Sequence, residues 1–194
     1  MKNVLYILAL LLTLVNCKKN QIPVDAPLDP VDTIQTHIDT SNMELGKCFV
    51  LKNSEQWNVP FKCTYYRKDT TFRIDADILH SNLLEEHFML RDIPCRPGRY
   101  SIEFFPSLAG LNNGLPESFF SYTYELDQPV GSFLIDTTRT DHFVEVTQYD
   151  SLTKTVKGQF QVFLGKKPSS VPFSGVPDSI FMTEGKFHLK IEDP

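Results

Sequence analysis

Residues 72–78 read FRIDADI, and this stretch decides the fold class because apolar and polar residues alternate strictly along it. Successive side chains of an extended chain point to opposite faces, so a period of two is typical of a strand with one buried and one solvated face. Phe72, Ile74 and their two apolar successors should therefore face a core. Arg73, Asp75 and Asp77 should face outward.

The same alternation recurs at residues 100–104, 144–146 and 160–164, and turn-forming pairs such as Pro97-Gly98 separate these runs. A helical spacing competes only at residues 79–89, where we still predict a strand from Glu86 to Leu90. Short strands and turns without a long amphipathic helix predict an all-β fold. We expect an antiparallel β-sandwich or a barrel-like domain over residues 44–194.

The composition supports this prediction and limits the classes of partner that the protein is expected to bind. The chain has 194 residues, 13 Pro, 15 Phe and 7 Tyr, which suits a single core built from short strands. The formal net charge is −5, and the basic pairs are dispersed among acidic residues. Binding to phosphates needs a basic patch, so nucleic acid is not an expected partner.

The first seventeen residues carry an export signal. Lys2 precedes an apolar run at residues 4–15, which is too short to span about 30 Å of hydrocarbon. This predicts a signal peptide at residues 1–16. Leu14-Val15-Asn16-Cys17 resembles the lipobox of bacterial lipoproteins, although Asn16 replaces the usual small residue, a change tolerated in lipoproteins of Bacteroidetes. The resemblance implies that Cys17 carries lipid and anchors the chain to a membrane.

Residues 17–43 are expected to form a flexible linker behind the lipid, because they are rich in Pro, Asp and Thr and show no periodicity. The residues after Cys17 lack the acidic cluster that surface-exposed Bacteroidetes lipoproteins tend to carry. By that resemblance we expect an outer membrane lipoprotein that faces the periplasm rather than the cell surface.

The domain itself resembles an uncharacterised family of small Bacteroidetes lipoproteins, known only as a domain of unknown function. The segments that carry the resemblance are residues 53–57, 97–100, 142–150, 156–160 and 180–187. It implies the fold and the location but supplies no catalytic residues. Gly158 and Gly185 are expected where the backbone has a positive φ or is closely approached, with Phe160 and Phe187 pointing at the core.

Three cysteines follow Cys17, and an oxidising compartment favours one pair and one odd thiol. A disulfide between Cys48 and Cys63 would close a loop of about fifteen residues. Cys63 with Cys95 is the alternative pairing. No cysteine has a histidine beside it in the sequence, so none is expected to be a catalytic nucleophile.

No catalytic motif or cofactor-binding motif is present, and we predict neither a catalytic residue, a metal nor a cofactor. Asp75, Asp77, His80 and His87 are the only cluster that could hold a cation, and solvated charge explains it better.

Two further sets of residues could carry function. Sites that resemble the O-glycosylation motif of exported Bacteroidetes proteins are Thr33, Thr70, Thr137, Ser151 and Ser179. A ligand surface is predicted from clustered aromatic residues, of which neighbours in a strand must face opposite ways: Phe119, Phe120, Tyr122 and Tyr124.

These observations favour a lipid-anchored cell-envelope protein that binds a protein or a glycan rather than one that catalyses a reaction. The alternative is an envelope hydrolase or a metal-dependent enzyme with a site built from distant loops. A cleft with converging carboxylates or histidines would favour the second interpretation.

Overall fold

The computed structural model describes residues 42–66, 70–81, 83–103, 115–125, 128–168 and 173–193. They belong to one of the two units into which the chain divides, His37–Pro194. The predicted signal peptide, the linker as far as residue 41, and the sites predicted at Cys17 and Thr33 lie outside the described residues.

The described residues form eleven strands and no helix, which confirms the all-β prediction. The predicted strand at residues 86–90 lies inside β5, so the helical alternative for residues 79–89 is wrong. The strands are β1 (Lys47–Lys52), β2 (Glu55–Gln56), β3 (Phe61–Tyr66), β4 (Thr71–Leu79), β5 (Leu84–Pro94), β6 (Gly98–Ser101), β7 (Glu117–Tyr124), β8 (Gln128–Ile135), β9 (Phe143–Asp150), β10 (Thr155–Lys166) and β11 (Ser179–Lys190).

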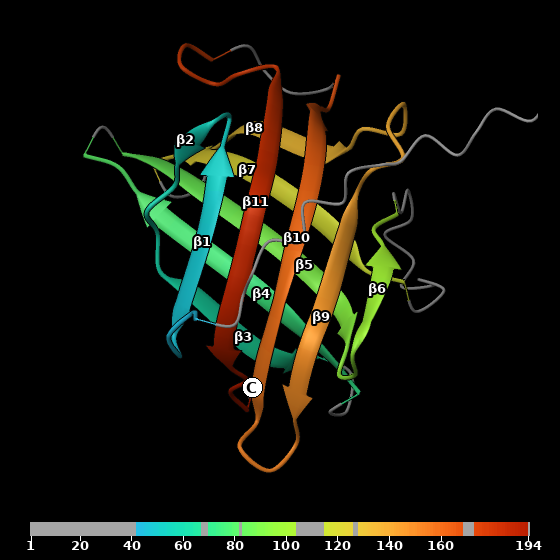
Figure 1. Cartoon of the computed structure of the whole chain (residues 1–194). Coiled ribbons are helices and arrows are strands. Elements are labelled where there is room, and N and C mark those ends of the chain that lie inside the picture. Colours follow the sequence, from blue (N-terminus) through green and yellow to red (C-terminus); the bar gives the residue numbers. More distant parts are fainter. Residues whose placement is uncertain are drawn as a thin grey trace, which may run out of the picture. The chain divides into compact units, whose positions relative to one another are not determined.

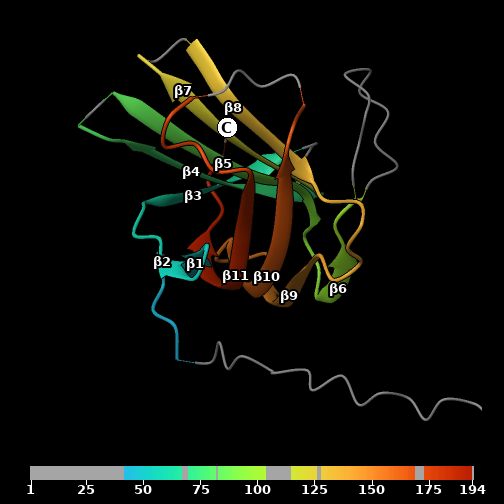
Figure 2. The same ribbon diagram turned by 90° about the horizontal axis from the view of Figure 1, so that it is seen from above.

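All strands belong to one antiparallel sheet, with the order β2-β1-β11-β10-β8-β7-β5-β4-β3. The first part of β10 pairs with β9, which in turn pairs with β6, and the end of β10 pairs with β8. The sheet curls into a half-barrel, so that β1, β11, β10 and β9 face β3, β4, β5, β7 and β8 across the interior (Figures 1 and 2). The structure thus confirms a barrel-like all-β fold.

Glu192, two residues beyond β11, pairs with the edge strand β3. The backbone N–H of Tyr65 in β3 donates to the carbonyl of Glu192 at 3.0 Å, and the N–H of Glu192 donates to the carbonyl of Cys63 at 2.8 Å. This short parallel bridge satisfies part of the free edge of β3, which would otherwise present unpaired backbone groups to solvent.

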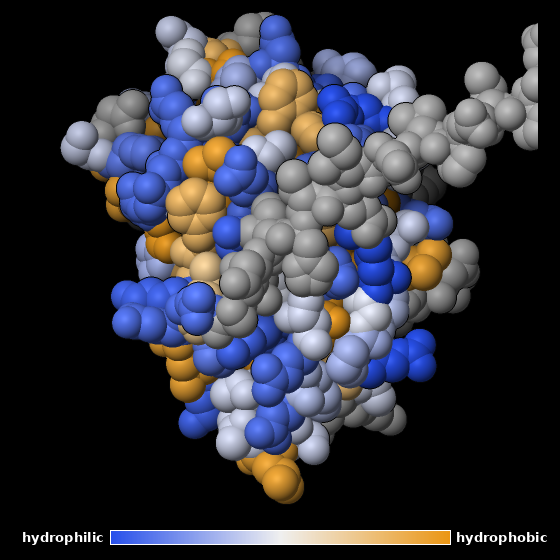
Figure 3. Space-filling view, in the orientation of Figure 1, coloured by the Kyte–Doolittle hydropathy of each residue, from blue (hydrophilic) through white to orange (hydrophobic). Residues whose placement is uncertain are grey.

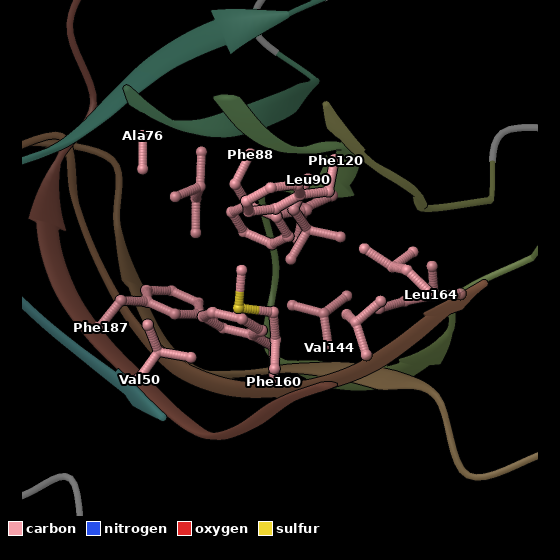
Figure 4. Packing of buried hydrophobic residues seen from close by; sticks show 14 of the residues in the cluster. Val50, Ala76, Phe88, Leu90, Phe120, Val144, Phe160, Leu164 and Phe187 are labelled. Atoms are coloured by element: carbon pink, nitrogen blue, oxygen red, sulfur yellow. The ribbon is translucent and has the colours of Figure 1, made fainter. Parts of the chain in front are cut away.

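The core fills the space between the facing strands, as Figure 4 shows. Gly158 of β10 lies opposite Phe187 of β11, and Phe160 lies opposite Gly185, so each ring covers the neighbouring glycine. A Cβ atom at Gly158 would lie 2.1 Å from the carbonyl oxygen of Glu145. Close approach, and not a positive φ, is therefore the reason for both glycines, and the predicted burial of Phe160 and Phe187 is confirmed.

The face of the molecule in Figure 3 mixes hydrophilic and hydrophobic side chains. Among the described residues, Leu152 in the turn between β9 and β10 is the most exposed large hydrophobic residue, at 94%. Isolated exposed leucines are common on soluble domains and do not by themselves mark a binding surface.

Candidate functional site

Two polar side chains, Glu86 of β5 and Tyr122 of β7, point into the apolar interior at the end of the half-barrel where β1 ends and β5 begins. The strand register places Glu86 between Ile78 of β4 and Tyr122. Along β5 the neighbouring inward positions are occupied by Leu84 and Phe88. Glu86 is only 5% exposed and Tyr122 only 4%, so both polar groups occupy core positions.

The hairpin of β1 and β2 brings a cation to the same place. Cys48 and Val50 face the core from β1, and the period of two puts Lys52, the last residue of the strand, on the same face. Trp57 follows β2, and its backbone N–H donates to the carbonyl of Val50 at 3.0 Å. Lys52 and Trp57 therefore lie opposite Glu86 and Tyr122 across the interior.

Asn53 fixes the turn of this hairpin. Asn53 and Ser54 have φ values of 50° and 70°, in the left-handed region that asparagine tolerates better than most residues. The Asn53 side chain accepts a hydrogen bond from the N–H of Phe181 at 2.8 Å and donates to the carbonyl of Ser179 at 3.3 Å. Both partners belong to β11, so the turn is attached to the centre of the sheet.

The ammonium group of Lys52 is enclosed by acidic and aromatic side chains. Its Nζ forms a short ion pair with Oε2 of Glu86 and lies 3.5 Å from the hydroxyl of Tyr122. The same atom lies 5.4, 5.6 and 5.7 Å from the ring centroids of Trp57, Phe120 and Tyr122. These distances fall within the range in which a ring face attracts a cation. We call these five residues the ammonium cage.

His80 contacts the second oxygen of the Glu86 carboxylate. The distance from its Nε2 to Oε1 of Glu86 is 3.0 Å, and the histidine side chain is 40% exposed. His80 lies in the turn between β4 and β5, where its N–H donates to the carbonyl of Leu84 and its carbonyl accepts from the N–H of Leu83. Both carboxylate oxygens of Glu86 are thus engaged, one by an interior cation and one by an imidazole near the surface.

Burial sets the electrostatics of the cage. The pKa of Tyr122 is raised, chiefly by desolvation and further by the negative charge of Glu86, so the phenol stays protonated at neutral pH. The side chains of Lys52 and Glu86 are 16% and 7% exposed. An ion pair with so little solvent loses several kcal/mol of hydration per ion, and an apolar pair of similar volume would often be as stable. A buried ion pair is therefore weak evidence for a role in stability, and another role has to be considered.

The structure brings together only part of the predicted aromatic surface. Phe120 and Tyr122 point inward and join the cage, whereas Phe119 faces outward, with its ring 6.4 Å from that of His87. Tyr124 packs against Phe173 at 5.3 Å. A ligand role for these four residues stays a prediction.

The predicted acidic and histidine cluster is divided between the two faces of the sheet. His87 and Asp77 form an outward pair, with 2.5 Å between Nδ1 and Oδ1, and Arg73 pairs with Asp75 at 2.9 Å. His80 instead contacts Glu86. Within the described ranges no group of three or more His, Cys, Asp or Glu side chains is arranged to hold a metal.

Cys48 and Cys63 are thiols in the structure, Cys48 on the inner face of β1 and Cys63 on the inner face of β3. Burial raises the pKa of both thiols, which disfavours the reactive thiolate. Cys95 follows β5 and is close enough to Cys63 to contribute to its raised pKa. Neither disulfide pairing is tested by these observations, and both stay predictions.

The predicted glycosylation sites differ in exposure. Thr70, Thr137 and Ser151 are exposed, whereas Ser179 is half-buried in β11. Asp136 and Asp150 each accept hydrogen bonds from backbone N–H groups two residues later, which forms the turns that hold Thr137 and Ser151. Their modification stays a prediction.

Sequence reasoning did not identify Lys52 and Glu86 as a pair. The signal was present in each strand separately, since Lys52 continues the inward series of Cys48 and Val50, and Glu86 interrupts the inward series of β5. A charged residue at a core position of an alternating strand needs a partner of opposite charge. Alternation therefore indicates that each charge needs a partner, but it does not show that these two positions face each other.

In the part of the chain that the structure describes, no helix has the length and apolar character needed to cross a membrane. No family model, curated protein or solved structure matches the chain. The resemblance to small Bacteroidetes lipoproteins therefore remains an expectation from the sequence.

Proposed function

We propose that this chain is a non-enzymatic binding protein of the cell envelope, anchored by lipid on Cys17 at the outer membrane and facing the periplasm. Its recognition site is the ammonium cage, and its partner is a protein or a glycan of the envelope. The observation that carries the proposal is the Lys52–Glu86 ion pair enclosed by three aromatic rings. A carboxylate and aromatic ring faces attract cationic groups, and charge-assisted hydrogen bonds give that recognition a direction.

Binding to isolated envelope fractions tests the recognition site. Full-length lipoprotein is titrated onto outer-membrane and peptidoglycan fractions, and Glu86→Gln is compared with the wild type. The matched control is Glu85→Gln, because Glu85 neighbours Glu86 on β5 but faces outward. We expect Glu86→Gln to weaken saturable binding roughly tenfold or more, with Glu85→Gln unchanged. Equal binding by all three proteins would overturn the cage as the recognition site.

Mass spectrometry tests the anchor separately. A lipid mass on a peptide that begins at Cys17, absent from Cys17→Ala, is the expected result. An unmodified N-terminus at another position would contradict the lipid anchor. The proposed role of the cage would then depend on the binding assay alone.

The contact between His80 and Glu86 favours a second candidate, an envelope hydrolase. A buried carboxylate that orients an imidazole is an arrangement used in general acid–base catalysis. Under this alternative, purified protein would hydrolyse chromogenic esters or glycosides, and both His80→Ala and Glu86→Gln would abolish turnover. Absence of turnover across such a panel, together with Glu86-dependent binding, favours the binding protein.

A further inference from the structure

The cage consists of a rigid part and a flexible part. Glu86 lies in the middle of the sheet, paired on one side with β4 and on the other with β7. Phe120 and Tyr122 lie on β7, between β5 and β8. The backbone of these three residues is held by strand pairing on both sides. Lys52, by contrast, reaches the cage on a stem of four methylene groups from the end of β1, and such stems change rotamer readily.

The rigid part has the chemistry of a cation receptor. It offers a carboxylate oxygen and a phenol oxygen for N–H donors and the ring faces of Phe120 and Tyr122. Trp57, which follows β2, adds a third ring, and the three ring centroids lie 5.4 to 5.7 Å from the Lys52 ammonium. Carboxylates and aromatic faces both attract cations. An anionic ligand would be repelled by the Glu86 carboxylate, whose backbone is held between β4 and β7. The removable group is thus the cation, and the remaining receptor selects another cation.

The polar contacts distinguish between kinds of organic cation. Lys52 donates to both Glu86 and Tyr122, so the occupant of the cage needs N–H groups directed at two oxygens. A quaternary ammonium ion has no N–H and would leave these buried acceptors without donors, at a cost in free energy. A primary ammonium satisfies both oxygens as Lys52 does.

From this asymmetry we infer that the cage is a binding site for primary alkylammonium groups, in which Lys52 is the resident occupant that a ligand amine replaces. The inference rests on the proposed binding function and names its ligand class. The ligand amine would reach the cage along the path of the Lys52 side chain, which is 16% exposed. A lysine side chain of a partner and a free amine share this chemistry.

Removal of the resident lysine provides the test. Trp57 is the single tryptophan of the chain and part of the cage, so its fluorescence reports on occupancy. We expect full-length Lys52→Ala to bind n-butylammonium saturably, with a dissociation constant on the order of millimolar, and to bind tetramethylammonium at least about tenfold more weakly. The matched control is Lys47→Ala, which removes an exposed lysine from the same strand and should show no saturable change.

A second measurement and a second variant keep the test informative if Lys52→Ala is less stable than the wild type. If Lys52→Ala is destabilised, n-butylammonium should raise its thermal midpoint, since a ligand that binds the native state stabilises it. In Lys52→Ala with Glu86→Gln the uncompensated carboxylate is gone, and the amine should have no effect. An equal response of Lys52→Ala and the double variant, or an equal response to both ammonium ions, would overturn the inference.

Failure of this inference and failure of the proposed function are distinguishable. If Lys52→Ala ignores n-butylammonium while envelope binding still depends on Glu86, only the ligand class is wrong. If the amine binds as expected while Glu86→Gln leaves envelope binding unchanged, the cage is an amine site and the proposed envelope function is wrong.

Discussion

Lys52 and Lys154 both hold their ammonium groups beside aromatic rings, at opposite ends of the half-barrel, yet their surroundings differ. Lys52 lies among three rings and pairs with Glu86, whose side chain is 7% exposed. Lys154, in the turn between β9 and β10, lies 5.6 Å from the ring centroid of Tyr65 and pairs with Asp193, whose side chain is 71% exposed. The same two interactions are thus formed once inside the domain and once in solvent.

The difference shows that burial, and not the type of contact, determines what a lysine can do. An exposed ion pair is screened by water and contributes about 0 to 1 kcal/mol. A buried pair interacts strongly, but it also loses its hydration, so it adds little to stability while either member alone is costly. The exposed pair is therefore dispensable, whereas the buried pair behaves as a unit.

The largest expected effect comes from breaking that unit. Glu86→Ala leaves the Lys52 ammonium buried without a counter-ion, and we expect the free energy of unfolding to fall by about 3 to 5 kcal/mol. Urea denaturation measures this change. A loss below about 1 kcal/mol would mean that Lys52 simply turns out to solvent, and the contrast with Lys154 would disappear.

Replacing both members together should restore much of the lost stability. Lys52→Met combined with Glu86→Leu removes both charges and fills a similar volume. Such replacements are often neutral or stabilising by about 1 to 4 kcal/mol, so we expect unfolding at or above the wild-type urea midpoint. Binding of the envelope partner should be lost in the same protein. A double variant as unstable as Glu86→Ala would show that the ion pair is needed for the fold.

A smaller effect on stability is expected at alkaline pH, and it involves a tyrosine near each of the two lysines. The pKa of Tyr122 is raised chiefly by burial, and that of Tyr149 chiefly by its hydrogen bond with Tyr65. Because the folded pKa values lie above the ordinary tyrosine value of about 10, their contribution to stability is complete below that pH and falls as the pH rises further. Thermal midpoints are measured from about pH 8 to about pH 11, a range that spans this pKa. The midpoint should fall less steeply with pH in Tyr122→Phe and in Tyr149→Phe than in the wild type. An unchanged slope in both variants would contradict the assignment.

The smallest effect is expected at the exposed pair. Lys154→Ala should lower the free energy of unfolding by less than about 1 kcal/mol, and added salt should reduce even that difference. Urea denaturation at low and high ionic strength measures both quantities. A loss as large as that of Glu86→Ala would remove the distinction between the two lysines.

Strand positions could be predicted from the sequence because alternation is a local property. The residues of β4 and the inward direction of Phe160 and Phe187 follow from a period of two, and the structure confirms them. Phe119 and Phe120 also face opposite ways as the same period requires, although which of them is buried depends on the neighbouring strands.

The cage could not be assembled from the sequence because its members meet through the curl of the sheet. Lys52 and Glu86 are 34 residues apart, and Tyr122 lies a further 36 residues along the chain. Their meeting requires that β1 pairs with β11 and that this half of the sheet faces β5 and β7. No local pattern encodes strand order. His80 and His87 illustrate the same limit, since adjacency in sequence suggested one cluster and the two faces of the sheet separate them.

The pairing of β1 with β11 also has a consequence for the order in which the chain can fold. The register joins Cys48 to Phe187, and residue 192 bonds to β3, so both early strands depend on partners that the ribosome adds much later. Contacts of such long sequence separation form slowly because a large loop must close first. During synthesis the early strands remain without these partners, and a holding chaperone would find its binding sites there.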